Sequence, residues 1–185
     1  MKKELVSRRE IESKLGSMGD FVKIDFLTKC LKNQLDFDSR RFAFLKLSEL
    51  YEKRGMFLEA GRMLHNAAPI NPSEAGKVSD FLGAAGFFVK GGNFDQADII
   101  FEKALALSDG RQKESIRSKR IELYKLQADI YLAKDKRHNA MVVFEKLLDL
   151  NLNDGEKKDA QERLLKLYER LGKIREYYSL KKGMM

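Results

Sequence analysis

The stretch Ser79–Leu107, which reads SDFLGAAGFFVKGGNFDQADIIFEKALAL, carries the pattern that decides the fold of this chain. Apolar residues recur in it at intervals of three and four, which is the spacing of one face of a helix and not the alternation of a strand. Gly91 and Gly92 interrupt this pattern, and glycine readily adopts the left-handed conformation that ends a helix. Asn93, or Asp95, can then cap the start of a second helix with its side chain. We therefore expect two helices joined by a tight turn.

The same pattern occurs at two other places in the chain. When Gly55, Gly92 and Asp135 are aligned, an alanine stands five residues after each aligned position and an aromatic residue stands four residues before it. The residues at these two positions are Ala60, Ala97 and Ala140, and Tyr51, Phe88 and Tyr131. Small residues at fixed places let two helices approach closely, and each hairpin leaves an apolar face that a neighbouring hairpin must cover. The repetition therefore predicts a row of stacked helical hairpins.

These aligned residues resemble the tetratricopeptide repeat, a helix–turn–helix unit of about 34 residues. The resemblance implies an all-α fold in which antiparallel helical hairpins stack into a right-handed superhelix, and a single helical-repeat domain over residues 1–185. The expected parts are N-terminal helices in 1–40, repeat units at 41–74, 78–111 and 121–154, and a degenerate unit or C-terminal cap in 155–185. The wide spacing before the third unit predicts an extended helix from about Asp109 to Ala133.

Composition limits the cellular setting and the class of protein. The chain has 185 residues, 36 Lys and Arg, 28 Asp and Glu, and a formal net charge of +8. Its single cysteine, Cys30, excludes an intramolecular disulfide and favours a reducing compartment. The longest apolar stretch, Phe81–Val89, is far shorter than the roughly 20 residues that span a bilayer, and no apolar signal-peptide core follows the charged N-terminal residues. We expect a cytoplasmic, water-soluble protein without membrane insertion.

No combination of residues in the sequence predicts catalysis. His65 and His138 are far apart in the sequence, and neither has cysteine or histidine partners at the spacing of a metal site. The Gly91–Asn93 segment lacks the Lys-Ser/Thr pair of a phosphate-binding loop. We therefore expect no catalytic residue, no metal and no cofactor, and the chain is not expected to be an enzyme.

The resemblance places a partner-binding groove on the first helix of each hairpin. The positions that would line this groove are Phe42, Leu45 and Glu49 in the first unit, Ser79, Leu82, Gly86 and Val89 in the second, and Glu122, Lys125 and Asp129 in the third. The middle of such a groove is small and apolar and its ends are charged, which suits a peptide or an amphipathic helix of a partner protein. Gly83 and Gly86 would admit either a partner's backbone or a neighbouring helix of the same chain. The first hypothesis is thus a protein–protein interaction scaffold or adaptor.

A basic segment supports an alternative hypothesis. Residues 111–137 carry +5 of the net charge of +8. The expected basic patch consists of Arg111, Lys113, Arg117, Lys119 and Arg120. Such a patch can bind nucleic acid or a ribonucleoprotein through phosphate contacts, although residues 111–123 contain no aromatic side chain that would stack on a base. A third possibility, self-association, follows from the apolar residues Tyr177, Tyr178 and Leu180 near the C-terminus.

Overall fold

The computed structural model describes residues 7–184, and within them the chain forms ten α-helices, one short 3-10 helix and no strand. The expected all-α class is therefore confirmed. The described residues divide into two compact units, one ending at Lys113 and the other beginning at Glu114. Each unit is described by itself below.

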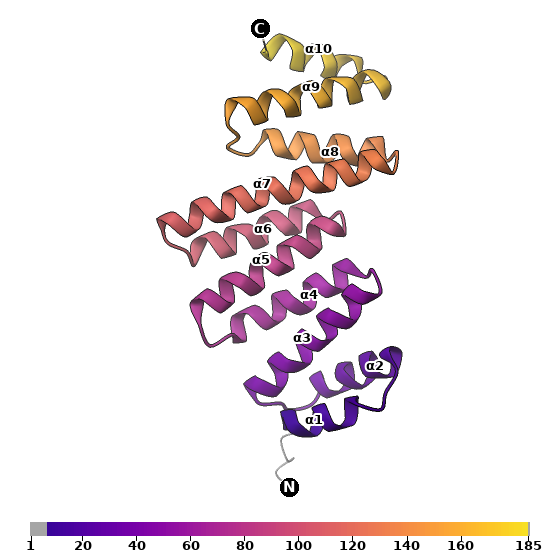
Figure 1. Cartoon of the computed structure of the whole chain (residues 1–185), viewed down its shortest axis with the longest axis vertical. Helices are drawn as coiled ribbons and strands as arrows, with labels where there is room; N and C mark the ends of the chain where they lie inside the picture. Colours follow the sequence, from indigo (N-terminus) through magenta and orange to yellow (C-terminus); the bar gives the residue numbers. More distant parts are fainter. Residues whose placement is uncertain (1–6, 185) are drawn as a thin grey trace. The chain divides into compact units, whose positions relative to one another are not determined.

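The first unit is a series of helices in which each α-helix from α2 to α5 packs against the next α-helix (Figure 1). Its elements are α1 (Arg8–Leu15), α2 (Asp20–Leu31), α3 (Phe37–Lys53), α4 (Phe57–Ala67), the 3-10 helix η1 (Ala68–Ile70), α5 (Glu74–Lys90) and α6 (Phe94–Ala106). The helices α1 and α2 are the two that were expected in residues 1–40, and both pack on α3. The helix α4 stops before Pro69, because proline cannot donate to the helical hydrogen-bond ladder.

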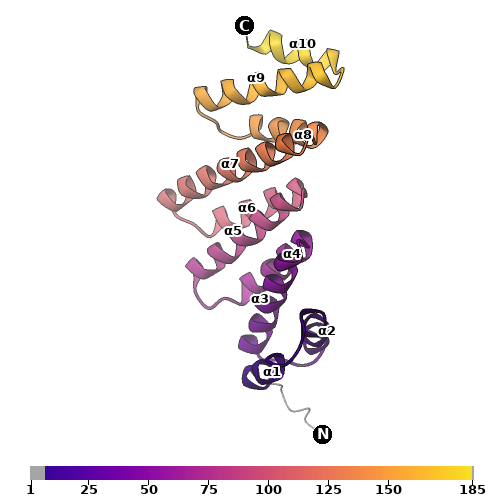
Figure 2. The ribbon, with the colours of Figure 1, turned by 45° about the vertical axis from the view of Figure 1, so that its right-hand side comes forward.

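The second unit contains most of the long helix α7 (Gly110–Ala133), whose bounds match the predicted extended helix. It continues with α8 (Arg137–Leu148), α9 (Asp154–Arg170) and α10 (Ile174–Gly183), as Figure 2 shows. The helix α9 packs on both α8 and α10. None of the side chains of α10 is buried, so this helix lies at the surface of its unit.

One turn geometry closes four helical hairpins in the part of the chain that is described. Gly55, Gly92, Asp135 and Gly172 all have positive φ angles, of 70°, 78°, 53° and 67°. In each turn the next amide donates to the carbonyl of an aromatic residue five positions earlier: Met56 to Tyr51, Asn93 to Phe88, Lys136 to Tyr131 and Lys173 to Tyr168, at 2.8–2.9 Å. This is the Schellman ending of a helix. The alignment of Gly55, Gly92 and Asp135 in the sequence is thus an alignment of backbone conformation, and Gly172 extends it to a fourth hairpin.

Small residues make the close contact between the two helices of a hairpin. Ala60 and Ala97, on the second helices α4 and α6, have no solvent-exposed surface. The hydroxyl of Ser48, on α3, donates to the backbone carbonyl of Ala60 at 2.9 Å, which requires the two helices to approach within hydrogen-bonding distance. The capping predicted at the start of α6 comes from Asn93, whose side chain accepts a hydrogen bond from the amide of Gln96.

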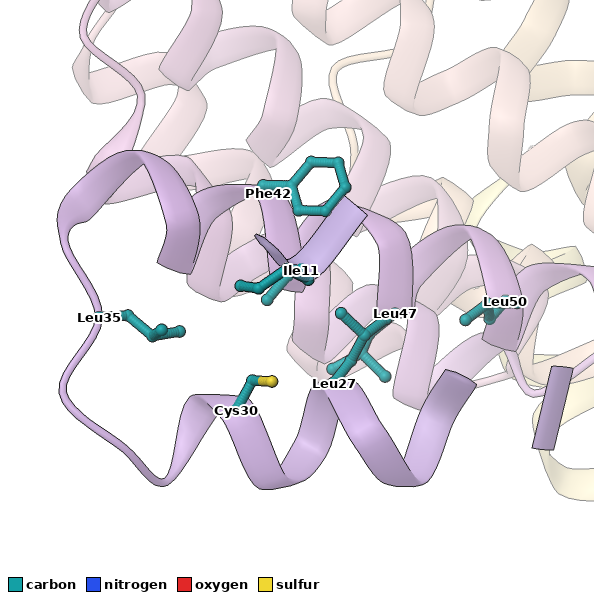
Figure 3. Close-up of a cluster of buried hydrophobic side chains, with 8 residues drawn as sticks. Ile11, Leu27, Cys30, Leu35, Phe42, Leu47 and Leu50 are labelled. Carbon is teal, nitrogen blue, oxygen red and sulfur yellow. The ribbon is translucent and has the colours of Figure 1, made fainter. Parts of the chain in front are cut away.

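A cluster of buried side chains joins α1 and α2 to the first hairpin (Figure 3). Its members include Ile11, Leu27, Cys30, Leu35, Phe42, Leu47 and Leu50. Burial raises the pKa of the Cys30 thiol, so this cysteine packs as a small apolar group and its thiolate is disfavoured.

Candidate partner-binding surface

In the first unit, the first helices of two successive hairpins run in the same direction and are joined by two ion pairs. The guanidinium of Arg41, in the first half of α3, contacts the carboxylate of Asp80, in the first half of α5, at 2.8 Å. At the other ends of these helices, the ammonium of Lys90 lies 3.6 Å from the carboxylate of Glu52. Two ion pairs in this order require a parallel arrangement of α3 and α5.

The second helices of the same hairpins form another layer. The ammonium of Lys103 on α6 lies 2.9 Å from Nε2 of His65 on α4. The His65 ring also contacts the ring of Phe81, with 5.8 Å between the ring centroids. Burial, followed by the charge of Lys103, lowers the pKa of His65, so the imidazole is neutral at neutral pH.

The residues predicted to line a groove in this unit have different degrees of exposure. Glu49 and Ser79 are exposed, and Leu45, Leu82 and Gly86 are half-buried. We call these five residues the α3–α5 face. The other two predicted residues, Phe42 and Val89, are only 8% and 1% exposed. Phe42 belongs to the core cluster of Figure 3, and Val89 is buried at the end of α5, so neither belongs to the accessible face.

The structure accounts for Gly83 as a packing residue. A Cβ atom added at Gly83 would lie 2.7 Å from Cδ2 of Leu64, on the neighbouring helix α4. Gly83 therefore makes room for a side chain of the same chain, which was one of the two possibilities left open by the sequence.

In the second unit, the predicted groove residues of α7 are engaged with other charged groups. The ammonium of Lys125 lies 2.6 Å from the carboxylate of Glu156 on α9, and Asp129 lies 2.8 Å from the guanidinium of Arg163 on the same helix. Glu122 pairs with Lys119 at 2.9 Å. The hydrogen bond from Lys125 and that from the Asn153 amide lower the pKa of Glu156. These pairs hold α7 and α9 parallel, as α3 and α5 are held in the first unit.

A surface hollow of about 450 Å³ lies between α7 and the start of α9. We call it the α7–α9 hollow. Its lining residues are Glu114, Arg117, Ser118, Ile121, Glu122, Lys125, Asn151, Asn153 and Glu156. Its basic side chains all have acidic partners, because Arg117 pairs with Glu114 one turn away and Lys125 pairs with Glu156.

The predicted basic patch is partly neutralised for the same reason. Arg117 and Lys119 each pair with a glutamate three residues away on α7, and Arg120 also has an interaction partner. Arg111 and Lys113 have no ion pair among the described residues, and they belong to the first unit, whereas Arg117, Lys119 and Arg120 belong to the second. Exposed pairs of this kind exchange readily with other ions, so they weaken a phosphate-binding surface without removing it.

A second surface hollow, of about 310 Å³, was not predicted from the sequence. It lies among α1, α2 and α3, and we call it the N-terminal hollow. Its lining residues are Glu12, Leu15, Gly16, Asp20, Lys23, Leu27, Phe42, Lys46, Glu49, Leu50 and Lys53. The repeat pattern does not extend to α1 and α2, so of these lining residues only Phe42 and Glu49, on α3, were among the predicted groove residues. The signal that could have found it is the stripe of Phe42, Lys46, Glu49, Leu50 and Lys53 on one face of α3.

Among residues 7–184, no group of three His, Cys, Asp or Glu side chains could hold a metal ion. The two histidines lie on different elements, His65 on α4 and His138 on α8. None of the helices in this range is long and apolar enough to cross a membrane.

No protein-family model matches the chain, and neither does any curated protein. The function is therefore inferred from the geometry of the surface.

Proposed function

We propose that this chain is a non-catalytic scaffold of tetratricopeptide-like hairpins, stacked as a right-handed superhelix, which binds a segment of a partner protein on the first helices of its hairpins. The observation that carries the proposal is the parallel direction of α3, which carries Leu45 and Glu49, and α5, which carries Ser79, Leu82 and Gly86. Surfaces of this kind bind helices or extended peptides through apolar anchors.

The chemistry of the α3–α5 face favours a peptide or helix as ligand. Leu45 and Leu82 are half-buried, so a partner's apolar side chain would remove their remaining surface from water. Ser79 and Gly86 are small, which leaves space for the partner's backbone to approach α5. The half-buried Arg41–Asp80 ion pair favours this arrangement of α3 and α5 before a partner arrives, and such pre-organisation lowers the entropic cost of binding.

Nucleic-acid or ribonucleoprotein binding through Arg111–Arg120 is the alternative that must be distinguished. The unpaired Arg111 and Lys113 favour it, and the pairing of Arg117 with Glu114 and of Lys119 with Glu122 disfavours it. Binding of that kind is strongly weakened by salt, because it depends on the release of counterions from phosphates.

The test is capture of partners from host lysate by the tagged full chain, with and without nuclease, at low and moderate salt. Ser79→Arg adds bulk and charge at an exposed position of the α3–α5 face, and Leu82→Glu charges a half-buried one. We expect a defined protein that survives nuclease and salt, and that is lost with both variants while Arg117→Glu combined with Arg120→Glu retains it. Recovery that requires nucleic acid, or that only the arginine variant removes, would refute the proposal.

A further inference from the structure

The two surface hollows differ in how their charges are satisfied. In the α7–α9 hollow, Arg117 and Lys125 are both neutralised by glutamates of the same chain. In the N-terminal hollow, Lys46 pairs with Glu49 at 2.8 Å, but Lys23 and Lys53 have no ion pair among the described residues. The N-terminal hollow therefore has basic groups that are available to a ligand.

The acidic side chains of the N-terminal hollow do not cancel these lysines. Glu12 pairs with Arg8 at 2.9 Å, and Glu49 is engaged by Lys46. Asp20 has no ion pair among the described residues, but it lies in the first turn of α2, where the helix dipole stabilises a negative charge. Two ammonium groups and one carboxylate thus remain uncommitted, and the balance favours an anionic ligand group.

The floor of the N-terminal hollow is apolar. Leu27, Phe42 and Leu50 are buried members of the core cluster, and Leu15 is half-buried (Figure 3). A volume of about 310 Å³ is at the lower end of the ~300–1,000 Å³ found for ligand pockets, so it suits one or two side chains rather than a whole helix.

We propose that the N-terminal hollow binds one large apolar side chain of an acidic protein segment, and that Lys23 and Lys53 pair with carboxylates flanking that side chain. The inference rests on the proposed scaffold function and names the chemistry of the partner at a hollow that shares Phe42 and Glu49 with the predicted groove. Nucleic acid is the competing ligand class, since lysines can contact phosphates, and the experiment below tests it directly.

Gly16 provides a way to block the hollow without disturbing the fold. It lies on the wall of the hollow with helical backbone angles, φ −55° and ψ −37°. An added Cβ atom would meet only the carbonyl oxygen of Ser13, at an ordinary 3.9 Å. A side chain can therefore start at Gly16 without backbone strain or a clash at Cβ, and Gly16→Leu adds apolar bulk at the wall of the hollow. Gly110→Leu is the matched control, because a Cβ atom there meets nothing within 4 Å and Gly110 does not line the hollow.

The experiment measures fluorescence polarisation of a short fluorescein-labelled peptide that has a central leucine and glutamates one helical turn away on either side. Its comparison peptides replace the leucine by alanine or the glutamates by lysine, and a single-stranded oligonucleotide serves as a generic polyanion. The protein is the full chain, as wild type and as Lys23→Gln with Lys53→Gln. Lys29→Gln with Lys32→Gln removes the same charge from two exposed positions outside the hollow, one on α2 and one directly after it.

We expect binding that requires both the leucine and the glutamates. It should weaken about five- to tenfold in the Lys23/Lys53 variant, and at least as much in Gly16→Leu, while both controls bind like wild type. Equal binding of the alanine peptide or the oligonucleotide, equal loss in the Lys29/Lys32 control, or no leucine-dependent binding at the highest attainable protein concentration would each overturn the inference.

The failure of this inference is separable from that of the proposed function. If the hollow variants change nothing but Ser79→Arg still abolishes capture of a partner, the hollow is excluded and the scaffold proposal stands. If capture is insensitive to Ser79→Arg and Leu82→Glu, the α3–α5 face is excluded as the docking surface.

Discussion

The hairpin turns predict that two chemically identical substitutions will have opposite effects on stability. Gly55 and Gly110 both face open space, since a Cβ atom added at either would meet nothing within 4 Å. Gly55 has a φ of 70°, whereas Gly110 is the first residue of α7. Any difference between Gly55→Ala and Gly110→Ala therefore comes from the backbone conformation and not from contacts.

The magnitude follows from two opposing terms. Alanine reduces the freedom of the unfolded chain, which stabilises the folded state by about 0.4–1 kcal/mol wherever the native conformation is allowed. The left-handed conformation costs an L residue about 1–2 kcal/mol. We therefore expect Gly110→Ala to raise the free energy of unfolding by about 0.5 kcal/mol, and Gly55→Ala to lower it by about 1 kcal/mol.

The assay is urea unfolding followed by far-UV circular dichroism, with the free energy of unfolding obtained by linear extrapolation. A shift of both variants in the same direction and by the same amount would refute the argument that positive φ selects glycine at this turn.

Asp135 gives a check in the opposite direction, since it is the non-glycine residue at the equivalent position, with a φ of 53°. Its ion pair with Arg137 is exposed and is worth at most about 1 kcal/mol. Asp135→Gly should therefore leave stability unchanged or raise it slightly, where Gly55→Ala lowers it.

Three further predictions concern single side chains. Burial and the charge of Lys103 lower the pKa of His65, so the folded state resists protonation of this imidazole. The free energy of unfolding should therefore fall as the pH drops below the unfolded pKa of about 6.5. His65→Gln should flatten this pH dependence in urea titrations at different pH values, and a pH dependence equal to that of the wild type would contradict the prediction. Tyr168→Phe removes a hydrogen bond of 2.9 Å to Glu145 and should cost about 1 kcal/mol, measured as a lower urea midpoint. Burial and Glu145 raise the pKa of Tyr168, so its stabilising contribution is complete below the unfolded pKa of about 10 and is lost above it, and an absorbance titration should show one phenol that ionises last. Cys30 should react with a thiol reagent only after unfolding, since it is buried, and rapid labelling of the native chain would disprove its place in the core.

The features predictable from the sequence were those set by local backbone chemistry. Gly55, Gly92 and Asp135 could be aligned because one turn conformation demands the same hydrogen bonds each time, and this alignment also gave the length of α7. Exposure was less predictable, because it depends on which element covers a helix face. Val89 occupies a position that the resemblance assigns to a groove, yet it is buried. The role of Gly83 likewise depended on Leu64, a residue on another helix.

The N-terminal hollow could not be predicted for a related reason. Its walls come from α1 and α2, which have no counterpart in the repeat, and its floor is shared with the core cluster. The sequence alone does not say which apolar residues of α2 and α3 meet. By contrast, the pairing of Arg117 with Glu114 and of Lys119 with Glu122 follows from a spacing of three residues on one helix, so the partial neutralisation of the basic patch was visible in the sequence.

The packing of the helices from α3 to α6 on their neighbours in the chain also has a consequence for how the first unit assembles. Contacts from α3 to α4, α4 to α5 and α5 to α6 join segments that are close in sequence, so little loop-closure entropy is lost before a contact forms. Helical proteins with such local topology fold in about microseconds to milliseconds. A hairpin closed by its Schellman turn can nucleate structure on its own and then add its neighbours, so α3–α4 and α5–α6 are alternative starting points, and a mutation that slows one leaves the other route open.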